Sequence, residues 1–96
     1  MRKPSILQDK KECFLTGRTT QLDCHHIYFG ADRKNSDENG FWVWLNHWRH
    51  IEDSPYPTPH NDKEVNWYLK RLCQERYEET HSREEFMNLM GRNYLD

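Results

Sequence analysis

The chain has 96 residues, which is enough for one small domain with a limited core. Its net charge of −2 excludes a bulk attraction to nucleic acid, although residues 1–50 carry eight Lys and Arg against six Asp and Glu, and residues 51–96 carry six against ten. Three scattered cysteines and the lack of a long apolar run exclude a disulfide framework and a membrane helix, so we expect a cytoplasmic protein with reduced thiols.

The first 40 residues predict short strands and loops. Residues 1–11 form a polar lead-in. Residues 13–18 predict a short strand that enters a turn at Gly17, and the β-prone stretch 22–29 predicts a second strand. Residues 30–40 are turn formers and charged residues, which predict a loop.

The rest of the chain predicts one more strand and then helices. The aromatic run 41–45 is the clearest strand, and a short helical turn is expected over 46–51 before a proline-rich loop. Asp62 is a good N-cap for a first amphipathic helix, Ser82 with Glu85 forms a capping box for a second, and Gly91 ends it. The apolar face of the first helix is expected to contain Val65, Tyr68, Leu69, Leu72, Cys73 and Tyr77.

Four of the six histidines lie where they could share a site. His25 and His26 are adjacent on the predicted strand, His50 follows the aromatic strand by about one helical turn, and His60 lies beyond the proline-rich loop. The alternative is that each is a surface or hydrogen-bonded histidine with no shared site. The order of strand, loop, strand and short helix around these residues favours a shared site.

Several stretches resemble the small HNH (ββα-metal) proteins that phages and prophages encode. The segments that carry the resemblance are 13–18, 22–30 with the His-His-Ile element, 42–45 with His50, and in the tail 74–79, Phe86 and 91–95. The resemblance runs from about residue 12 to the end. It implies an α+β fold: a ββα-metal, HNH-like hairpin-plus-helix core in residues 12–60, followed by two C-terminal amphipathic helices in residues 62–96 of the same domain.

The resemblance also implies an activity, the metal-dependent hydrolysis of DNA phosphodiester bonds in a bacterial host cell. His25 and His50 would be metal ligands, His60 a third ligand and His26 the general base, around one divalent ion. Nitrogen ligands suit Zn²⁺, Ni²⁺ or Mn²⁺ better than Mg²⁺. For the asparagine that braces the base, Asn39 is the nearest by spacing. Other candidates for that role are Asn35 and Asn46.

The chain departs from the family pattern at the structural zinc. Many relatives have two Cys-x-x-Cys knuckles, whereas here Cys13 is paired with Thr16, and Asn46 and Arg49 stand where the other pair would lie. One cysteine cannot hold a tetrahedral zinc ion, so we predict no structural zinc ion held by four cysteines. The cluster of tryptophans at 42, 44 and 48 and the C-terminal helices are then expected to hold the domain together.

Four basic residues are candidate contacts to the phosphate backbone of DNA: Arg18, Arg33, Lys34 and Arg92. The alternative for each is a solvated loop charge. Cys24 is expected to be a small buried residue and not a nucleophile.

Two other functions stay open from the sequence. The fold could serve as a weak or inactive relative that binds or inhibits a host protein or a nucleic acid. It could also be a structural zinc module in which His25, His50 and His60 with Cys24 only hold the fold. The oligomeric state is left open, because no stretch of the sequence marks an interface.

Overall fold

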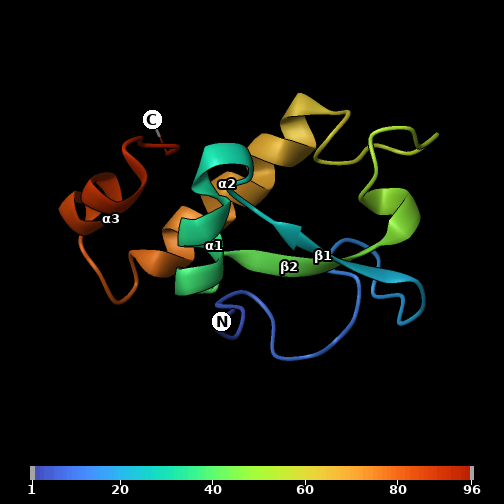
Figure 1. The fold of residues 1–96 in the computed structure, drawn as a ribbon, viewed down its shortest axis with the longest axis horizontal. Helices are drawn as coiled ribbons and strands as arrows, with labels where there is room; N and C mark the ends of the chain where they lie inside the picture. Colours follow the sequence, from blue (N-terminus) through green and yellow to red (C-terminus); the bar gives the residue numbers. More distant parts are fainter. Residues whose placement is uncertain (1, 96) are drawn as a thin grey trace.

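The computed structural model describes residues 2–95 and shows a small α+β domain. Its elements in chain order, with η marking 3-10 helices, are β1 (Leu22–His26), η1 (Gly30–Asp32), α1 (Arg33–Asn39), β2 (Trp42–Asn46), η2 (His47–Arg49), α2 (Lys63–Tyr77) and α3 (Arg83–Met90). α3 lies at one end of the molecule and η2 at the other, with α1, α2 and the hairpin between them (Figure 1). None of the helices in the described residues is long and apolar enough to cross a membrane.

The two strands form an antiparallel hairpin, as predicted. Leu22 pairs with Asn46, and His26 pairs with Trp42 at the other end. β1 ends at His26 and not at residue 29, because the backbone of Tyr28 leaves the ladder: its N–H donates to the Ser36 hydroxyl (3.2 Å), and that hydroxyl donates to the Tyr28 carbonyl (2.7 Å). The prediction of a small α+β domain with a hairpin and helices is confirmed.

Two segments differ from the sequence prediction. The predicted loop at 30–40 is wrong, because this segment forms η1 and α1. α1 is anchored by the buried Ser36, and Gly40 ends it in the left-handed conformation (φ 73°). The predicted strand at 13–18 is also wrong. This segment is a turn in which the Gly17 N–H donates to the Cys13 carbonyl (2.8 Å), and the Phe14 N–H donates to the Trp44 carbonyl of β2 (2.8 Å).

Both C-terminal helices begin at the predicted caps. The Asp62 carboxylate accepts hydrogen bonds from the N–H groups of Glu64 (2.9 Å) and Val65 (3.3 Å). Ser82 and Glu85 form the predicted capping box, and α3 ends at the predicted glycine, residue 91. Such caps satisfy N–H groups that have no partner inside the helix, which is why they can be recognised from the local sequence.

The core lies where one end of the hairpin meets α2 and α3. Its largest fully buried side chains are Ile27, Tyr28, Phe41, Leu45, Leu69 and Phe86. The Tyr28 ring contacts Phe41 and Phe86 with centroids 5.5 and 5.9 Å apart, and its hydroxyl donates to the Lys70 carbonyl (2.7 Å). The predicted tryptophan cluster is wrong in one member: Trp42 is buried, but Trp48 on η2 is 45% exposed because η2 is remote from this core.

Residues 3–8, which we call the N-terminal strap, pack along β2. The Trp42 indole N–H donates to the Lys3 carbonyl (2.6 Å), and the Ile6 N–H donates to the Gly40 carbonyl (3.0 Å). Ile6 is partly buried against the core. Residues 3–8 of the lead-in expected over 1–11 therefore pack on the domain that follows.

Candidate metal centre

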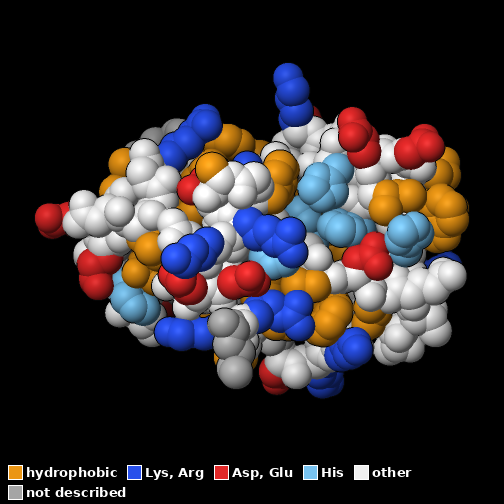
Figure 2. Space-filling view, viewed as in Figure 1, with side chains coloured by type: hydrophobic (Ala, Val, Ile, Leu, Met, Phe, Trp, Pro, Cys, Tyr) orange, Lys and Arg blue, Asp and Glu red, His pale blue; other side chains and the backbone are white. Residues whose placement is uncertain are grey.

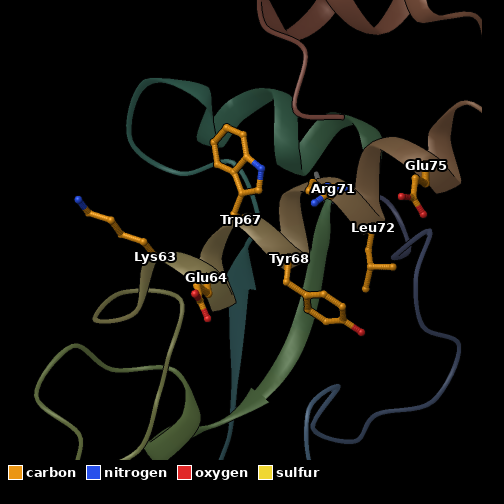
Figure 3. A pocket seen from close by; sticks show the side chains of 7 residues that line it. All are labelled: Lys63, Glu64, Trp67, Tyr68, Arg71, Leu72 and Glu75. Carbon is orange, nitrogen blue, oxygen red and sulfur yellow. The ribbon is translucent and has the colours of Figure 1, made fainter. Parts of the chain in front are cut away.

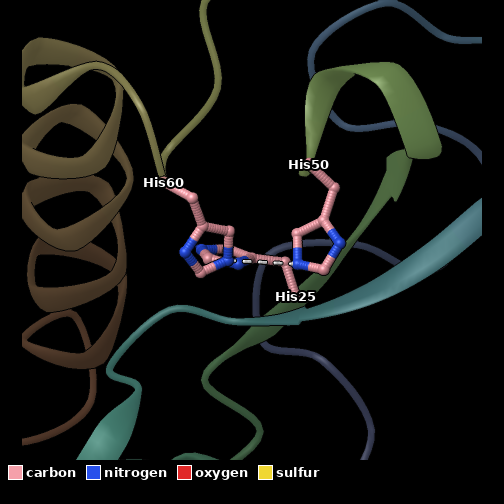
Figure 4. Close-up of side chains that lie close together, drawn as sticks. All are labelled: His25, His50 and His60. Carbon is pink, nitrogen blue, oxygen red and sulfur yellow. Dashed lines mark hydrogen bonds between the residues drawn. The ribbon is translucent and has the colours of Figure 1, made fainter. Parts of the chain in front are cut away.

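Three histidines from three different elements converge at one end of the hairpin. His25 comes from β1, His50 follows η2, and His60 lies in the loop before α2 (Figure 4). Ring nitrogens of all three lie within 4.8 Å of one another. The ring centroids are 5.0 Å apart for His50 and His60 and 5.2 Å apart for the other two pairs. The three histidines are close enough to bind one metal ion.

His25 has a buried nitrogen without a partner. Its side chain is 1% exposed, and among residues 2–95 its Nε2 is one of two buried side-chain polar atoms with no hydrogen bond. Burial, and secondarily the neighbouring His50, lower the pKa of His25 to about 2, so the ring is neutral. A buried polar atom left without a partner destabilises a fold by about 1–3 kcal/mol. A metal ion at this nitrogen would supply the missing interaction.

His50 is oriented by a carboxylate. Its Nδ1 lies 3.1 Å from Asp23 Oδ2, which His47 Nδ1 also approaches to 2.9 Å. Burial alone would raise the pKa of Asp23, but the hydrogen bonds from His47 and His50 lower it. With its Nδ1–H donated to the carboxylate, His50 has Nε2 left over, and this atom lies 3.3 Å from His60 Nε2. A carboxylate on the far nitrogen is the usual support of a metal-binding histidine.

His60 is held by an ordered loop. The side-chain amide of Asn61 donates to the carbonyls of Glu52 (3.1 Å), Ser54 (3.4 Å) and Tyr56 (3.0 Å), which gathers the proline-rich segment around one residue. Burial lowers the pKa of His60, and the neighbouring His50 lowers it further. The loop thus presents a second imidazole whose neutral form is favoured.

His26 faces a different partner. Its Nε2 lies 2.7 Å from Asp37 Oδ1 on α1. The structure does not bring Asn39, the predicted brace, to His26, since the Asn39 amide donates to the Asn35 carbonyl (2.8 Å) and its side chain lines a separate cavity. Asp37 is absent from the sequence prediction because residues 30–40 predict a loop. α1 has only seven residues, all of them polar, so no helical pattern in the sequence points to Asp37 as a partner of His26.

These histidines line one cavity of about 440 Å³, together with Arg2, Cys24, Phe29, Gly30 and Arg33. In the space-filling view, histidine side chains gather on one side of the face and Lys and Arg side chains lie beside them (Figure 2). Both arginines of the cavity come from segments that precede a strand in the chain, the lead-in and α1. The sequence interpretation identified Arg33 but not Arg2.

The other predicted phosphate contacts lie elsewhere. Lys34 is exposed and 3.9 Å from Glu38 on its own helix. Arg18 lines a different cavity beside η2, and the Arg92 guanidinium lies over the Trp67 ring, 5.1 Å from its centroid. The structure therefore brings only one of the four predicted basic residues to the histidines.

At the predicted position of the missing knuckle, Cys13 is buried. Burial would raise the pKa of its thiol, but hydrogen bonds, the strongest from the Asn46 backbone, lower it. The Asn46 side-chain amide donates to the Thr20 carbonyl (3.0 Å). The absence of a structural zinc ion stays a prediction. Cys24 is half-buried, and burial raises the pKa of its thiol, as expected for a residue that is not a nucleophile.

A larger cavity, of about 560 Å³, lies along the outer face of α2 (Figure 3). Its lining residues are Lys63, Glu64, Trp67, Tyr68, Arg71, Leu72 and Glu75. Basic and acidic residues alternate in order along α2, with Trp67 and Tyr68 between the two pairs (Figure 3). This surface offers no group of converging metal ligands, so size alone does not identify the chemical site.

Comparison with models of protein families, with curated proteins and with solved structures finds no significant match to this chain. The resemblance to HNH proteins stays a prediction, and function has to be inferred from the geometry of the histidine cavity.

Proposed function

We propose that the protein is a metal-dependent endonuclease that hydrolyses DNA phosphodiester bonds, with His25, His50 and His60 as metal ligands and His26 as the general base. The observation that carries the proposal is the buried Nε2 of His25, which has no hydrogen-bond partner and lies beside two further imidazole nitrogens. A site that only packed histidines together would leave this atom destabilising the fold.

The donor set fits a divalent transition metal. Three imidazoles from separate segments would leave open coordination positions, which is the arrangement of catalytic and not of structural zinc sites. Nitrogen ligands favour Zn²⁺, Ni²⁺ or Mn²⁺ over Mg²⁺. When bound, the ion would supply Lewis-acid stabilisation of the negative charge that develops on the phosphate.

His26 is arranged to move a proton. Asp37 accepts the Nε2–H of His26 at 2.7 Å, which leaves Nδ1 to take a proton from the water that attacks phosphorus. The carboxylate also stabilises the imidazolium that forms. As the water oxygen bonds to phosphorus, the ester P–O bond breaks and the leaving oxygen is protonated by solvent. Arg33, on the same cavity, would hold the phosphate.

The test is plasmid cleavage by the purified protein with Zn²⁺, Ni²⁺, Mn²⁺ and Mg²⁺ in turn. His26→Ala is expected to lower the cleavage rate by about 10²–10⁴-fold, the usual contribution of a general base, with metal content and melting temperature unchanged. His81→Ala is the matched control, because His81 stacks on Tyr77 outside the cavity. Failure of the folded, metal-loaded wild type to cleave any nucleic acid would overturn the proposal.

A second candidate is a binding protein that keeps this fold. It is favoured by the hollow along α2, where Tyr68 is 53% exposed beside Trp67. Exposed aromatic side chains in a hollow are common at protein interfaces. Under this alternative the protein would form a stable complex with a host protein, and His26→Ala would not weaken that complex.

A further inference from the structure

Two guanidinium groups line the histidine cavity, and neither is paired with a carboxylate of the described residues. Arg2 and Arg33 both line it, and no Asp or Glu is among its described lining residues. Within residues 2–95, neither arginine takes part in a salt bridge. The carboxylate of Asp37 pairs with His26, and that of Asp23 pairs with His50, so neither is taken up by the two arginines. Two arginines that line one cavity and take part in no salt bridge make a site for an anion.

We propose that Arg2 and Arg33 form a clamp for the phosphodiester of a nucleic acid, and that the N-terminal strap holds Arg2 in place. The inference rests on the proposed function, since the clamped phosphate would be the one next to the metal ligands. Guanidinium groups suit this anion because they donate two parallel hydrogen bonds to phosphate oxygens. No sequence pattern marks Arg2, which lies 23 positions before His25 in the polar lead-in.

Arg2 is positioned by aromatic rings of β2. Its guanidinium carbon lies 4.2 Å from the centroid of Trp42 and 5.4 Å from that of Trp44. The guanidinium also lowers the pKa of the Cys24 thiol, next to His25, against the larger effect of burial. Stacking on a ring face leaves the N–H groups at the guanidinium edge available to a ligand. Arg2 is therefore oriented without its positive charge being neutralised.

The strap, which directly follows Arg2 in the chain, is hydrogen-bonded to α1, the helix that carries Asp37. The Lys3 N–H donates to the carbonyl of Asp37 (2.9 Å), whose carboxylate contacts His26. The Ser5 hydroxyl donates to the Trp42 carbonyl (2.5 Å). The strap thus ties the position of Arg2 to that of the candidate base, so both would face one phosphate.

Glycine at position 40 allows the strap to lie against the backbone at the end of α1. A Cβ at position 40 would lie 2.2 Å from the Pro4 carbonyl oxygen, a backbone atom that cannot move away unless the strap moves. Gly91 ends α3 with the same φ of 73° but has no atom within 4 Å of its Cβ position. Gly91→Ala therefore reproduces the backbone strain of Gly40→Ala without the collision with the strap.

The experiment measures binding of a short fluorescein-labelled DNA duplex by anisotropy, using the zinc-loaded full chain in a His26→Ala background so that the duplex is not cut. Arg2→Ala is expected to weaken binding about tenfold and to reduce the slope of log K against log salt by about one. Arg2→Lys should recover part of the affinity. Lys11→Ala is the matched control: its ammonium lies 4.7 Å from the centroid of Trp44, but Lys11 does not line the cavity.

Gly40→Ala should weaken duplex binding as Arg2→Ala does, although Arg2 is still present, whereas Gly91→Ala should bind as the background protein does. Equal affinities for Arg2→Ala and Lys11→Ala, in variants with unchanged melting temperatures, would overturn the clamp. So would binding of inorganic phosphate without binding of the duplex, which would identify a free-phosphate site. Because this assay needs no cleavage, an inactive wild type that still binds DNA through Arg2 would overturn the nuclease and leave the clamp standing.

Discussion

Replacing His25 with leucine should change the stability of the metal-free and metal-loaded protein in opposite directions. In the metal-free wild type, the buried Nε2 of His25 has no partner and so destabilises the fold by about 1–3 kcal/mol. The substitution removes this nitrogen. Leucine has a similar size, so repacking should offset only part of this gain. We expect metal-free His25→Leu to be as stable as the wild type or about 1 kcal/mol more stable.

With metal the order should reverse. Free Zn²⁺ at 100 times its dissociation constant stabilises the folded state by about 2.7 kcal/mol. For a domain of this size, about 4–8 °C per kcal/mol converts this to a rise in melting temperature of about 10–20 °C. His25→Leu should lose that rise, because two histidines remain where three are needed.

The assay is thermal unfolding by circular dichroism, with chelator and with Zn²⁺. Asn66→Leu is the matched control, because Asn66 Oδ1 is the other buried atom without a partner in residues 2–95, and it lies outside the histidine group. Asn66→Leu should keep the full zinc response. The reasoning is refuted if His25→Leu keeps it too, or if the metal-free variant loses more than about 2 kcal/mol of stability.

Three further outcomes are expected. Asp23→Asn should weaken Zn²⁺ affinity about 10–100-fold in a chelator competition, because the carboxylate orients His50. Ser36→Ala should lower the free energy of unfolding in urea by about 2–3 kcal/mol, since it strips the buried backbone N–H and carbonyl of Tyr28 of their partner. The capping box lowers the pKa of Glu85, chiefly through the backbone N–H at the N-cap. Because this pKa is lowered on folding, the stabilisation from the Glu85 carboxylate should be present at neutral pH and lost as the pH falls below the carboxyl's ordinary pKa of 4.5. The difference in melting temperature between wild type and Glu85→Ala should therefore vanish in acid.

The elements that were predictable from the sequence are those specified locally. The strand over Trp42–Asn46 follows from a run of aromatic and β-branched residues, and α2 and α3 follow from Asp62 and Ser82 at their starts. α1 was not predictable, because its seven polar residues have no apolar period. It is held by Ser36, whose partner Tyr28 belongs to another segment.

The buried face of α2 shows the limit of periodicity. Tyr68 was expected in the core but is 53% exposed, whereas Gln74 is fully buried. Gln74 is accommodated because its amide donates to Glu78 (2.7 Å) and Asn93 (2.8 Å), and its carbonyl accepts from the Tyr94 N–H (2.7 Å). Hydropathy cannot anticipate such a network, because the partners lie up to 20 positions away.

The candidate site was predictable to a similar extent. Of the four histidines expected to share a site, three lie within reach of one metal ion: His25, His50 and His60. Asp37, which contacts His26, and Arg2, which lines the cavity, were missed, since they lie in segments interpreted as a loop and as a lead-in. In each case the missing information was a tertiary contact between α1 or the strap and the hairpin.

The three hydrogen bonds that the Asn61 side chain donates have a consequence for which metal ions the proposed site would select. In the proposed metal site, a loop whose backbone is already ordered would present His60 without a further loss of conformational entropy on binding, so more of the coordination energy would appear as affinity. The same rigidity limits how far the three nitrogens can adjust. Ions that accept a tetrahedral or five-coordinate arrangement around a rigid nitrogen face should therefore outcompete those that require an octahedron of oxygens. Loosening the loop at Asn61 should relax this preference before it abolishes binding.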